Sequence, residues 1–410
     1  MIILERFESA GPWGLSYGKS SLLERQIYSD RIEDIPWSFS EDSIEDQILS
    51  CKLDGKISRE LTGETLQESG LIKTGPLETR FASRLMQIAL DRYLKGPLSK
   101  TDRSDLNLVC AVEPQGSITG YRNGLRLGHN FNGDFNESLF IKNLDKIFKD
   151  VHPIMSLHNM PNQMAGNLAI NFELGGETIN VAGRNSSFEA FNSAIRLVKT
   201  NKNEKALLVG AFCYRPSLIS NLLYAITGSS LNSLKVNSPV LNEWVGVGCI
   251  RRSNKPRKGN MAIRGVSGTY FSSVDLISDT LLNLIEGLLR SARVDINELN
   301  LVLINDASSG WFTDQVLNIQ SFKYRFNFVD TYQRLGFGFH CGFLQSLELA
   351  QIIFDKGMIP GKLREGHRDS MFFSGIQHKK QFFNSRYILL VSLGFPNQIQ
   401  LVLLDGANSK

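Results

Sequence analysis

Residues 160–187 read MPNQMAGNLAINFELGGETINVAGRNSS and carry the clearest structural signal in the chain. Within this stretch, Thr178–Ala182 is a short, largely apolar run bounded by turn residues, which is typical of a buried strand. A tight turn follows, and beyond it the apolar positions Phe191, Ile195 and Val198 recur at spacings of three and four. The sequence therefore predicts a strand, a tight turn and an amphipathic helix with one buried stripe.

The same two patterns recur along the rest of the chain. Phe343, Leu347, Ala350 and Phe354 repeat the helical spacing. Because strands that alternate with helices of this length form βαβ units, we expect sheets covered on both faces by helices. The other apolar runs that predict buried strands are Leu106–Val112, Ala206–Phe212, Val245–Ile250, Leu299–Ile304, Ile388–Leu393 and Ile399–Leu404.

One order of elements occurs twice. In residues 1–240, a strand, a tight turn and a helix lead to the run ALLVGAF at 206–212. In residues 241–410, a Gly-rich turn and the helix around Leu347 lead to ILLVSLGF at 388–395. Two related halves divided near residue 240 would explain this repetition, and two unrelated α/β layers remain the alternative.

The composition is that of a folded globular protein. Of the 410 residues, 42% are hydrophobic and 21% are charged, which excludes wholesale disorder, collagen and coiled-coil rods. The 45 basic and 41 acidic side chains leave a net charge of only +4, far below the excess of a dedicated nucleic-acid binder. We therefore expect no nucleic-acid partner, while a mildly acidic protein partner is compatible with this charge.

The sequence predicts neither secretion nor a membrane span. Glu5 and Arg6 interrupt the N-terminal apolar residues before a segment of signal-peptide length forms. The longest uncharged run, Pro216–Leu234, contains Ser, Asn and Thr side chains that hydrocarbon would leave without hydrogen-bond partners. The five cysteines form no C-x-x-C pair, so we expect a reduced, cytoplasmic protein without a disulfide framework or a zinc site.

The order and spacing of residues 160–187 resemble the ketosynthase (β-ketoacyl-ACP synthase) family. In that family the pattern runs roughly P-N-x-x-A-G-x-x-A-x-x-F-x-x-x-G, then a strand, and then A-C-x-S-S at the start of a helix. The resemblance covers most of the chain from about residue 75 onward. It implies an α/β thiolase-like fold, with two related halves in a five-layered α-β-α-β-α arrangement that works as a dimer. Shorter matches are Thr79–Leu94, Trp244–Arg251, Val294–Asn305, Phe343–Pro360 and Gly394–Phe395.

The residues that this family uses for its reaction are missing. The position of its nucleophilic cysteine holds Arg184, and its two histidines correspond to Ala307 and Gly336. The lysine of its K-S-x-x-G-H segment corresponds to Thr331. Pro396 lies in the turn whose backbone N–H groups help to form the oxyanion hole, and a proline there removes a donor. We therefore expect no catalytic residue at these positions.

The loss of the cysteine matters most, because Claisen condensation needs a thiolate to carry the acyl chain. An arginine side chain is always protonated and is not acylated at neutral pH. Arg184 also places a cation at the positive end of the helix dipole, which is disfavoured by roughly 0.3–1 kcal/mol unless an anion compensates. The helix itself is still expected to begin cleanly, because Ser186 and Glu189 are spaced as a capping box.

Ketosynthase-like proteins without the cysteine occur as the chain length factor of type II polyketide synthases, and similar subunits occur in aryl polyene systems. The resemblance thus implies a non-catalytic subunit that pairs with an active ketosynthase in a heterodimer and shapes its acyl tunnel. It implies no cofactor, because the acyl chain arrives on the phosphopantetheine arm of an acyl carrier protein. In the best-known chain length factors the cysteine position holds glutamine, so Arg184 departs from them too. A divergent acyltransferase of the same fold is the alternative.

Two further sets of residues are candidates for contacts with partners. Met164, Phe172 and Phe188 are predicted to line the acyl tunnel near the dimer interface, or else to be ordinary core. A basic cluster is predicted to dock an acidic acyl carrier protein, or else to be a solvated loop. The cluster contains Arg251, Arg252, Lys255, Arg257 and Lys258.

The six histidines show no metal-binding spacing, so we expect no metal site. His340 and Cys341 are adjacent, as a base and a nucleophile would be if they paired. Neighbours on a helix point about 100° apart, which is a poor geometry for such a pair. We therefore expect Cys341 to be a buried packing residue.

Overall fold

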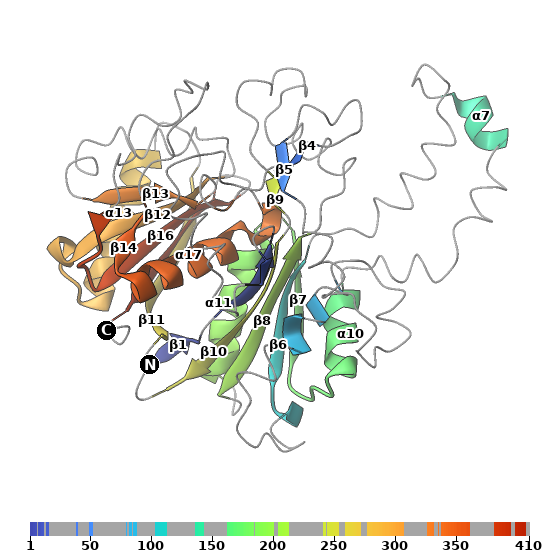
Figure 1. Ribbon diagram of the computed structural model, residues 1–410, viewed down its shortest axis with the longest axis horizontal. Coiled ribbons are helices and arrows are strands. Elements are labelled where there is room, and N and C mark those ends of the chain that lie inside the picture. The colour runs from blue at the N-terminus through green and yellow to red at the C-terminus, as the bar shows by residue number, and fades with distance from the viewer. Residues whose placement is uncertain are drawn as a thin grey trace.

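A computed structural model describes the sheet and the helices that cover it (Figure 1). Arg184, Ala307, Gly336 and Pro396, where the reaction residues are missing, lie outside the described residues. The described residues are 1–5, 7–11, 14–15, 38–39, 49–51, 79, 82–83, 85–87, 103–112, 136–142, 162–183, 185–200, 204–212, 241–242, 244–253, 259–271, 277–306, 326–331, 335, 338–360, 381–394 and 398–406.

Residues 2–252 contribute the first set of strands: β1 (Ile2–Leu4), β6 (Asn107–Val112), β7 (Thr178–Ala182), β8 (Lys205–Phe212) and β10 (Trp244–Arg252). They lie in the order β7-β6-β8-β10-β1. β6 pairs in parallel with β7 and β8, whereas β10 pairs antiparallel with β8 and β1. All of β6 and nearly all of β8 are buried, as expected for strands covered on both faces.

The second half contributes a matching set: β11 (Met261–Tyr270), β12 (Leu299–Asp306), β13 (Asn327–Asp330), β16 (Tyr387–Gly394) and β17 (Gln398–Asp405). Their order is β13-β12-β16-β17-β11. β12 pairs in parallel with β13 and β16, whereas β17 pairs antiparallel with β16 and β11. The pairing pattern of the first set is therefore repeated strand for strand.

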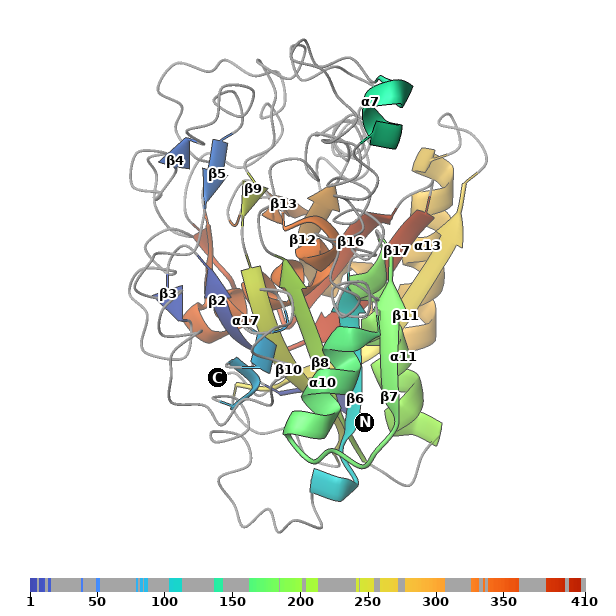
Figure 2. The ribbon, with the colours of Figure 1, turned by 90° about the vertical axis from the view of Figure 1, so that its right-hand side faces the viewer.

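β1 connects the two sets, because it pairs with β10 on one side and β11 on the other. The result is one continuous sheet of 12 strands that includes β2 (Glu8–Gly11) and β3 (Gly14–Leu15), and Figure 2 shows it from the side of β6 and β7. The other strands are β4 (Ser38–Phe39), β5 (Leu49–Cys51), β9 (Leu241–Asn242), β14 (Met358–Ile359) and β15 (Gln381–Phe382). The helices are α7 (Glu137–Lys142), α10 (Gln163–Asn171), α11 (Ser186–Thr200), α13 (Ile277–Ala292) and α17 (Gly342–Lys356), with 3-10 turns η4 (Ile296–Glu298) and η5 (Phe339–Cys341).

Three buried clusters show how the helices cover the strands. Alternate residues of β8 point to opposite faces, so Leu207 lies in the cluster with α10 and Leu208 in the cluster with α11 and α17. The cluster around α11 and α17 also contains Leu303 of β12, so these helices lie between the two sets of strands. The third cluster places α13 on the outer face of the second set, around Val302. The order from α10 to α13 is the five-layered α-β-α-β-α arrangement that the resemblance implied.

The seven predicted strands are all present, with ends that differ by two residues or fewer. Both amphipathic helices are confirmed as α11 and α17. Numbered along the chain within each set, the strands share the spatial order third, second, fourth, fifth, first, which supports related halves. By its pairing β10 lies with the first set of strands, although its residues follow residue 240. The division of the chain into two domains at residue 240 stays a prediction. The strand β11 was not predicted, because its sequence MAIRGVSGTY contains two glycines and little apolar continuity.

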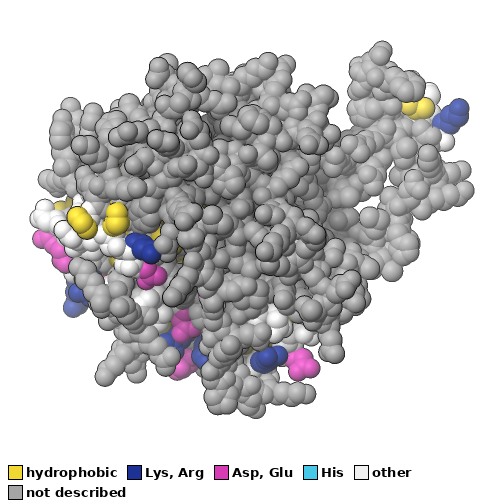
Figure 3. All heavy atoms as spheres, viewed as in Figure 1, with side chains coloured by type: hydrophobic (Ala, Val, Ile, Leu, Met, Phe, Trp, Pro, Cys, Tyr) yellow, Lys and Arg dark blue, Asp and Glu magenta, His cyan; other side chains and the backbone are white. Residues whose placement is uncertain are grey.

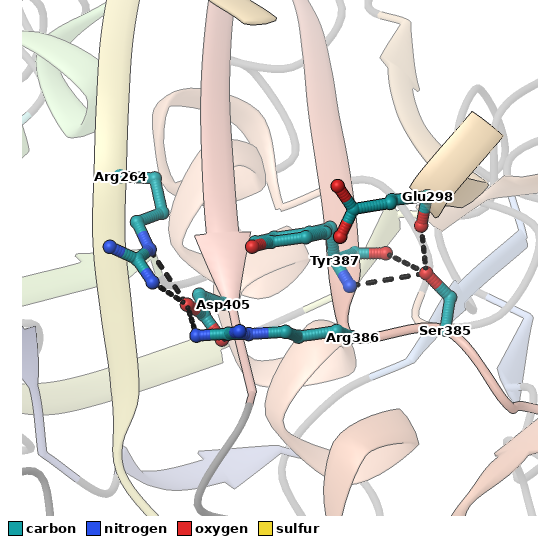
Figure 4. Close-up of polar contacts among 6 residues, drawn as sticks. All are labelled: Arg264, Glu298, Ser385, Arg386, Tyr387 and Asp405. Carbon is teal, nitrogen blue, oxygen red and sulfur yellow. Dashed lines mark hydrogen bonds and ion pairs between the residues drawn. The ribbon is translucent and has the colours of Figure 1, made fainter. Parts of the chain in front are cut away.

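A charged cluster holds the end of the last strand, β17 (Figure 4). The buried carboxylate of Asp405 accepts hydrogen bonds from Nε and Nη2 of Arg386, both at 2.9 Å. It also accepts one from Nε of Arg264 at 2.7 Å. Arg386 in turn lies over the ring of Tyr387, 5.3 Å from its centre. Because Arg264 is on β11 and Arg386 directly precedes β16, the cluster fastens three neighbouring strands together.

Candidate functional site

The expected nucleophile position lies on the turn between β7 and α11. β7 ends at Ala182 and α11 begins at Ser186, so the predicted strand, turn and helix are confirmed. Gly183 has a φ of 129°, a conformation that side-chain-bearing residues rarely adopt. Its N–H donates to the carbonyl of Val112 at 3.3 Å and so fixes the start of the turn against β6.

The start of α11 differs from the prediction. The hydroxyl of Ser186, the first helical residue, is buried and has no hydrogen-bond partner among the described residues. The N–H of Glu189 donates to the backbone carbonyl of Asn185 at 3.1 Å instead. The predicted capping box of Ser186 and Glu189 is therefore wrong. The helix begins after Asn185, so Ser186 lies one residue inside the position from which a capping side chain reaches back to the helix.

A network of amide side chains lies beside this turn and joins the two halves of the chain. Nδ2 of Asn185 donates to Oε1 of Gln398 at 2.6 Å, and Nε2 of Gln400 donates to the same oxygen at 2.8 Å. Nε2 of Gln398 donates to Oε1 of Glu189 at 3.3 Å. This network could not be predicted from the sequence, because Asn185 and Gln398 are far apart in the chain and no short motif connects them.

The histidine and lysine positions of the family's reaction are only partly described. β12 ends at Asp306, directly before Ala307, and β13 ends at Asp330, directly before Thr331. Thr331 is buried, and its hydroxyl lies 2.9 Å from that of Ser346 on α17. A neutral hydroxyl pair thus stands where the family has a lysine.

His340 and Cys341 occupy η5, the turn that leads into α17. The imidazole of His340 is buried edge-on against the ring of Phe212, with centres 6.2 Å apart. Burial lowers the pKa of His340 to about 4, although the nearby backbone carbonyls of Ala211 and Ala111 favour the charged form. His340 is therefore neutral near pH 7.

Three of the described cysteines are buried and form no disulfide: Cys110, Cys249 and Cys341. Burial raises the pKa of the Cys110 thiol, and burial together with the nearby charge of Glu5 raises that of Cys249. Neither thiol supplies a thiolate near neutral pH, so neither replaces the missing nucleophile. Cys341 lies against Gly210 of β8, within the central layer.

The three candidates for the acyl tunnel are all buried, but they do not form one wall. Met164 and Phe172 lie in the outer cluster with α10, on one face of the first set of strands. Phe188 lies in the central layer on the other face, with its ring edge-on to Phe343 at 5.2 Å. The sheet therefore separates Phe188 from the other two candidates, and a role of any of them in a tunnel stays a prediction.

Two of the five candidates for carrier-protein docking are described, and both have partners within the chain. Arg251 forms an ion pair with Glu5. Arg252 donates to the carbonyls of Val198 and Lys199 at 2.7 Å each, so it supplies hydrogen-bond donors to the carbonyls at the C-terminal end of α11. Described charged side chains of both signs are interspersed on the face shown in Figure 3. Docking by this cluster stays a prediction, and Lys255, Arg257 and Lys258 lie outside the described residues.

β7 is an edge strand whose outer side pairs with no other described strand. Its two end residues, Thr178 and Ala182, are exposed, and its central three are half-buried. α10 packs against β7 and presents Ile170, a large apolar side chain that is 65% exposed. An edge strand with an exposed apolar neighbour is suited to pairing with another chain.

Within the described ranges, no group of His, Cys, Asp and Glu side chains is placed to hold a metal ion. No described helix is both long enough and apolar enough to cross a membrane.

No family model matches the chain, and no curated protein matches it in sequence. Solved ketosynthase structures are nevertheless similar. A β-ketoacyl synthase from Burkholderia phymatum STM815 superposes with a TM-score of 0.72 and 13% identity, over 98% of each chain. An oxazolomycin ketosynthase domain from Streptomyces albus JA3453 gives a TM-score of 0.70 and 12% identity, over 98% of this chain and 75% of that chain.

A third similar structure is a ketosynthase in complex with its chain length factor from Xenorhabdus doucetiae. Its TM-score is 0.69 with 13% identity, over 98% of this chain and 97% of that chain. At such low identity these similarities show the fold alone. The chain has the thiolase-like fold of ketosynthases.

Proposed function

We propose that this chain is a non-catalytic, ketosynthase-like subunit that pairs with an active ketosynthase and shapes its acyl tunnel, as a chain length factor does. The pathway would be type II polyketide or aryl polyene biosynthesis. The observation that carries the proposal is the intact strand–turn–helix unit with Arg184 at the position of the nucleophile. A fold that is kept while its reaction residues are replaced indicates a role in assembly.

The described groups beside the turn support this proposal. Asn185, Gln398 and Gln400 are neutral amides whose hydrogen bonds are made to one another, and none of them is a nucleophile. The one carboxylate among the described members of the network, that of Glu189, accepts a hydrogen bond from Gln398. The network holds the turn against the second half of the chain without supplying any group that could carry an acyl chain.

The outer edge of β7, which pairs with no other described strand, supports a heterodimer. The N–H of Leu108 donates to the carbonyl of Glu177, and the N–H of Gly183 donates to that of Val112. Because successive backbone groups of a strand alternate in direction, those of Thr178 and Ala182 point away from β6. In the dimer implied by the resemblance this strand pairs across the two-fold axis, and obligate interfaces of this kind are apolar and typically above ~2,000 Å².

The proposal includes an acyl carrier protein as a second partner. The carrier would deliver the acyl chain on its phosphopantetheine arm, so the chain described here would need no cofactor of its own. Electrostatic attraction between basic side chains of the complex and the acidic carrier would favour docking. Measuring the affinity of the carrier protein for each subunit alone decides which of the two it contacts.

Co-expression with a candidate ketosynthase tests the assembly. We expect the two chains to co-purify as a heterodimer and the chain alone to be poorly soluble or self-associated. Intact-mass measurement after incubation with acyl carrier protein should show an acyl adduct on the ketosynthase and none on this chain. A stoichiometric adduct on this chain, or a stable monomer that ignores the ketosynthase in size-exclusion chromatography, would contradict the proposal.

Replacing the arginine sharpens this test. The Arg184→Cys chain should not condense acyl groups, because Ala307, Gly336 and Pro396 still lack the remaining machinery. Arg184→Ala is the matched variant without a thiol, and we expect it to lower the stability of the chain or of the complex. Condensation by Arg184→Cys alone would show that the histidine positions have been aligned wrongly.

One observation favours the alternative, a divergent acyltransferase. The hydroxyl of Ser186 is buried at the N-terminus of α11 without a hydrogen-bond partner among the described residues. A serine hydroxyl there would take the acyl group from the carrier's thioester and release the phosphopantetheine thiol. Peptide mapping after incubation with acyl carrier protein separates the two functions: an acyl group on Ser186, lost in Ser186→Ala, would replace the proposal of a non-catalytic subunit.

A further inference from the structure

A buried carboxyl group that forms no ion pair with any described cation lies on the second central helix, α17. Glu348 of α17 is 2% exposed. Its Oε1 accepts a hydrogen bond from the hydroxyl of Ser9 on β2, and its Oε2 accepts one from the indole N–H of Trp244 on β10 at 2.9 Å. Among the described residues, no Lys, Arg or His forms an ion pair with Glu348.

The charges on the two strands that pack against this carboxyl do not favour its ionised form. β2 presents a second carboxyl, that of Glu8, which is fully buried. β10 presents the neutral indole of Trp244, while its cations Arg251 and Arg252 lie at the opposite end of the strand. There they contact Glu5 and the end of α11. Among the residues that the structure describes, the negative charge of Glu348 thus meets a like charge and no opposite one.

Burial, with a smaller contribution from the charge of Glu8, raises the pKa of Glu348 to about 7, although the hydrogen bonds from Ser9 and Trp244 lower it. The protonated form fits the same surroundings. The indole of Trp244 can donate to the carbonyl oxygen, while the acid O–H can donate to the hydroxyl of Ser9. Loss of the proton to water leaves a charge in an apolar interior beside Glu8.

The same helix holds the neighbouring backbone of the N-terminal segment. The N–H of Phe7 donates to Oε1 of Gln351 at 2.9 Å, and Nε2 of Gln351 donates to the carbonyl of Gly259 at 3.1 Å. The ring of Phe7 lies 5.9 Å from that of Trp244 and packs over Gly246, where any side chain would collide with both rings. Residues 7–9 are therefore enclosed between β10 and α17, with Glu348 at the centre of their contacts.

We propose that the protonation of Glu348 controls how firmly residues 7–9 are held between β10 and α17. In the neutral acid the segment is fully docked, and in the carboxylate its contacts with Ser9 and Trp244 loosen. The structure thus contains a proton-sensitive contact that is independent of the turn at residue 184 and of any partner. It would make the N-terminal part of the fold less firmly attached as the pH rises through neutrality.

Hydrogen exchange of the full chain, read by mass spectrometry between pH 5.5 and 8.5, tests this proposal. After correction for the intrinsic exchange rate, the protection of residues 1–11 should fall about tenfold or more across this range. The reason is that the docked segment binds a proton more tightly than the released segment, so rising pH favours release. The loss should be absent in Glu348→Gln. It should persist in Glu286→Gln, a matched change at an exposed position of α13.

A second variant covers the case in which Glu348→Gln fails to fold. Glu8→Gln removes the like charge, so the transition in protection should move to lower pH but remain. Tryptophan fluorescence should show the same midpoint, because the indole of Trp244 contacts the titrating group. Constant protection across the range in the unmodified chain would overturn the proposal. So would a pH dependence that survives Glu348→Gln or disappears in Glu8→Gln.

Discussion

The helices α11 and α17 occupy equivalent places in the two halves of the chain, but their surroundings differ. Each follows the third strand of its set, and both lie in the central layer. α11 exposes charged residues such as Arg196 and Lys199, whereas α17 buries Gln345, Glu348 and Gln351 along with its apolar face. The equivalent helix is thus partly exposed to solvent in the first half (α11) and largely buried in the second half (α17).

The third strands of the two sets, β7 and β13, also differ in solvent exposure. β7 is exposed at both ends, while β13 is buried at every residue except the first. Each strand terminates the sheet at one edge. Among the described residues, the first set of strands thus ends in an exposed edge strand and the second set in a buried one.

The largest expected effect concerns the central layer between the two helices. Phe188→Ala removes a ring that packs on Phe343, and we expect it to cost ~3–5 kcal/mol of stability. Phe172→Ala and Met164→Ala probe the outer layer in the same way. Chemical denaturation measures these losses, and product analysis of the reconstituted complex measures chain length. Longer products from any of these variants would support a tunnel wall, whereas altered yield at constant length would remove that role.

The next effect depends on pH and concerns the start of α17. The pKa of His340 is lowered to about 4 by burial, so its neutral form stabilises the fold above about pH 6.5 and this stability is lost as the pH falls through 4. The loss should be on the order of 3 kcal/mol. His340→Leu should reduce the difference in unfolding free energy between pH 7 and pH 4. An unchanged difference would assign the acid sensitivity to other groups.

The third prediction tests whether β7 is an interface. Ala182→Pro removes an N–H that points away from β6, so the chain should stay folded while affinity for the ketosynthase falls about tenfold, or ~1.4 kcal/mol. Ala182→Ser is the matched control, because it retains the N–H with little change in size. Binding isotherms of the two variants provide the measurement. Equal affinities would place the interface elsewhere.

The smallest effects concern the ends of the two helices. Arg252 donates to the last carbonyls of α11, whereas α17 ends at Gly357, whose φ is 63°. Arg252→Ala should cost roughly 0.3–1 kcal/mol of stability, and Gly357→Ala about 1 kcal/mol. Thermal unfolding checks both values. If Arg252→Ala instead leaves stability unchanged and weakens binding of the carrier protein, Arg252 is a docking residue and not a helix cap.

The elements with strong local patterns could be predicted from the sequence. β6, β8, β16 and β17 are continuous apolar runs, and α11 and α17 have regular spacing, so their burial follows from composition and period. β11 could not be predicted in this way, because it is stabilised by pairing with β1 and β17 and has little apolar continuity of its own. The predicted capping box is wrong although Ser186 and Glu189 have the correct spacing. The helix begins at Ser186 itself, one residue earlier than a capping role of Ser186 requires.

The sequence by itself determined the repeated order of strands and helices and the absence of a thiol at residue 184, because both are written in local residue types. Only the tertiary structure decided which side chains meet. Asn185 contacts Gln398 and Glu348 contacts Ser9 across large separations in the chain, and no local pattern encodes such pairs. It also separated Phe188 from Met164 and Phe172, because alternate residues of a strand face opposite layers and only the assembled sheet shows which layer each helix covers.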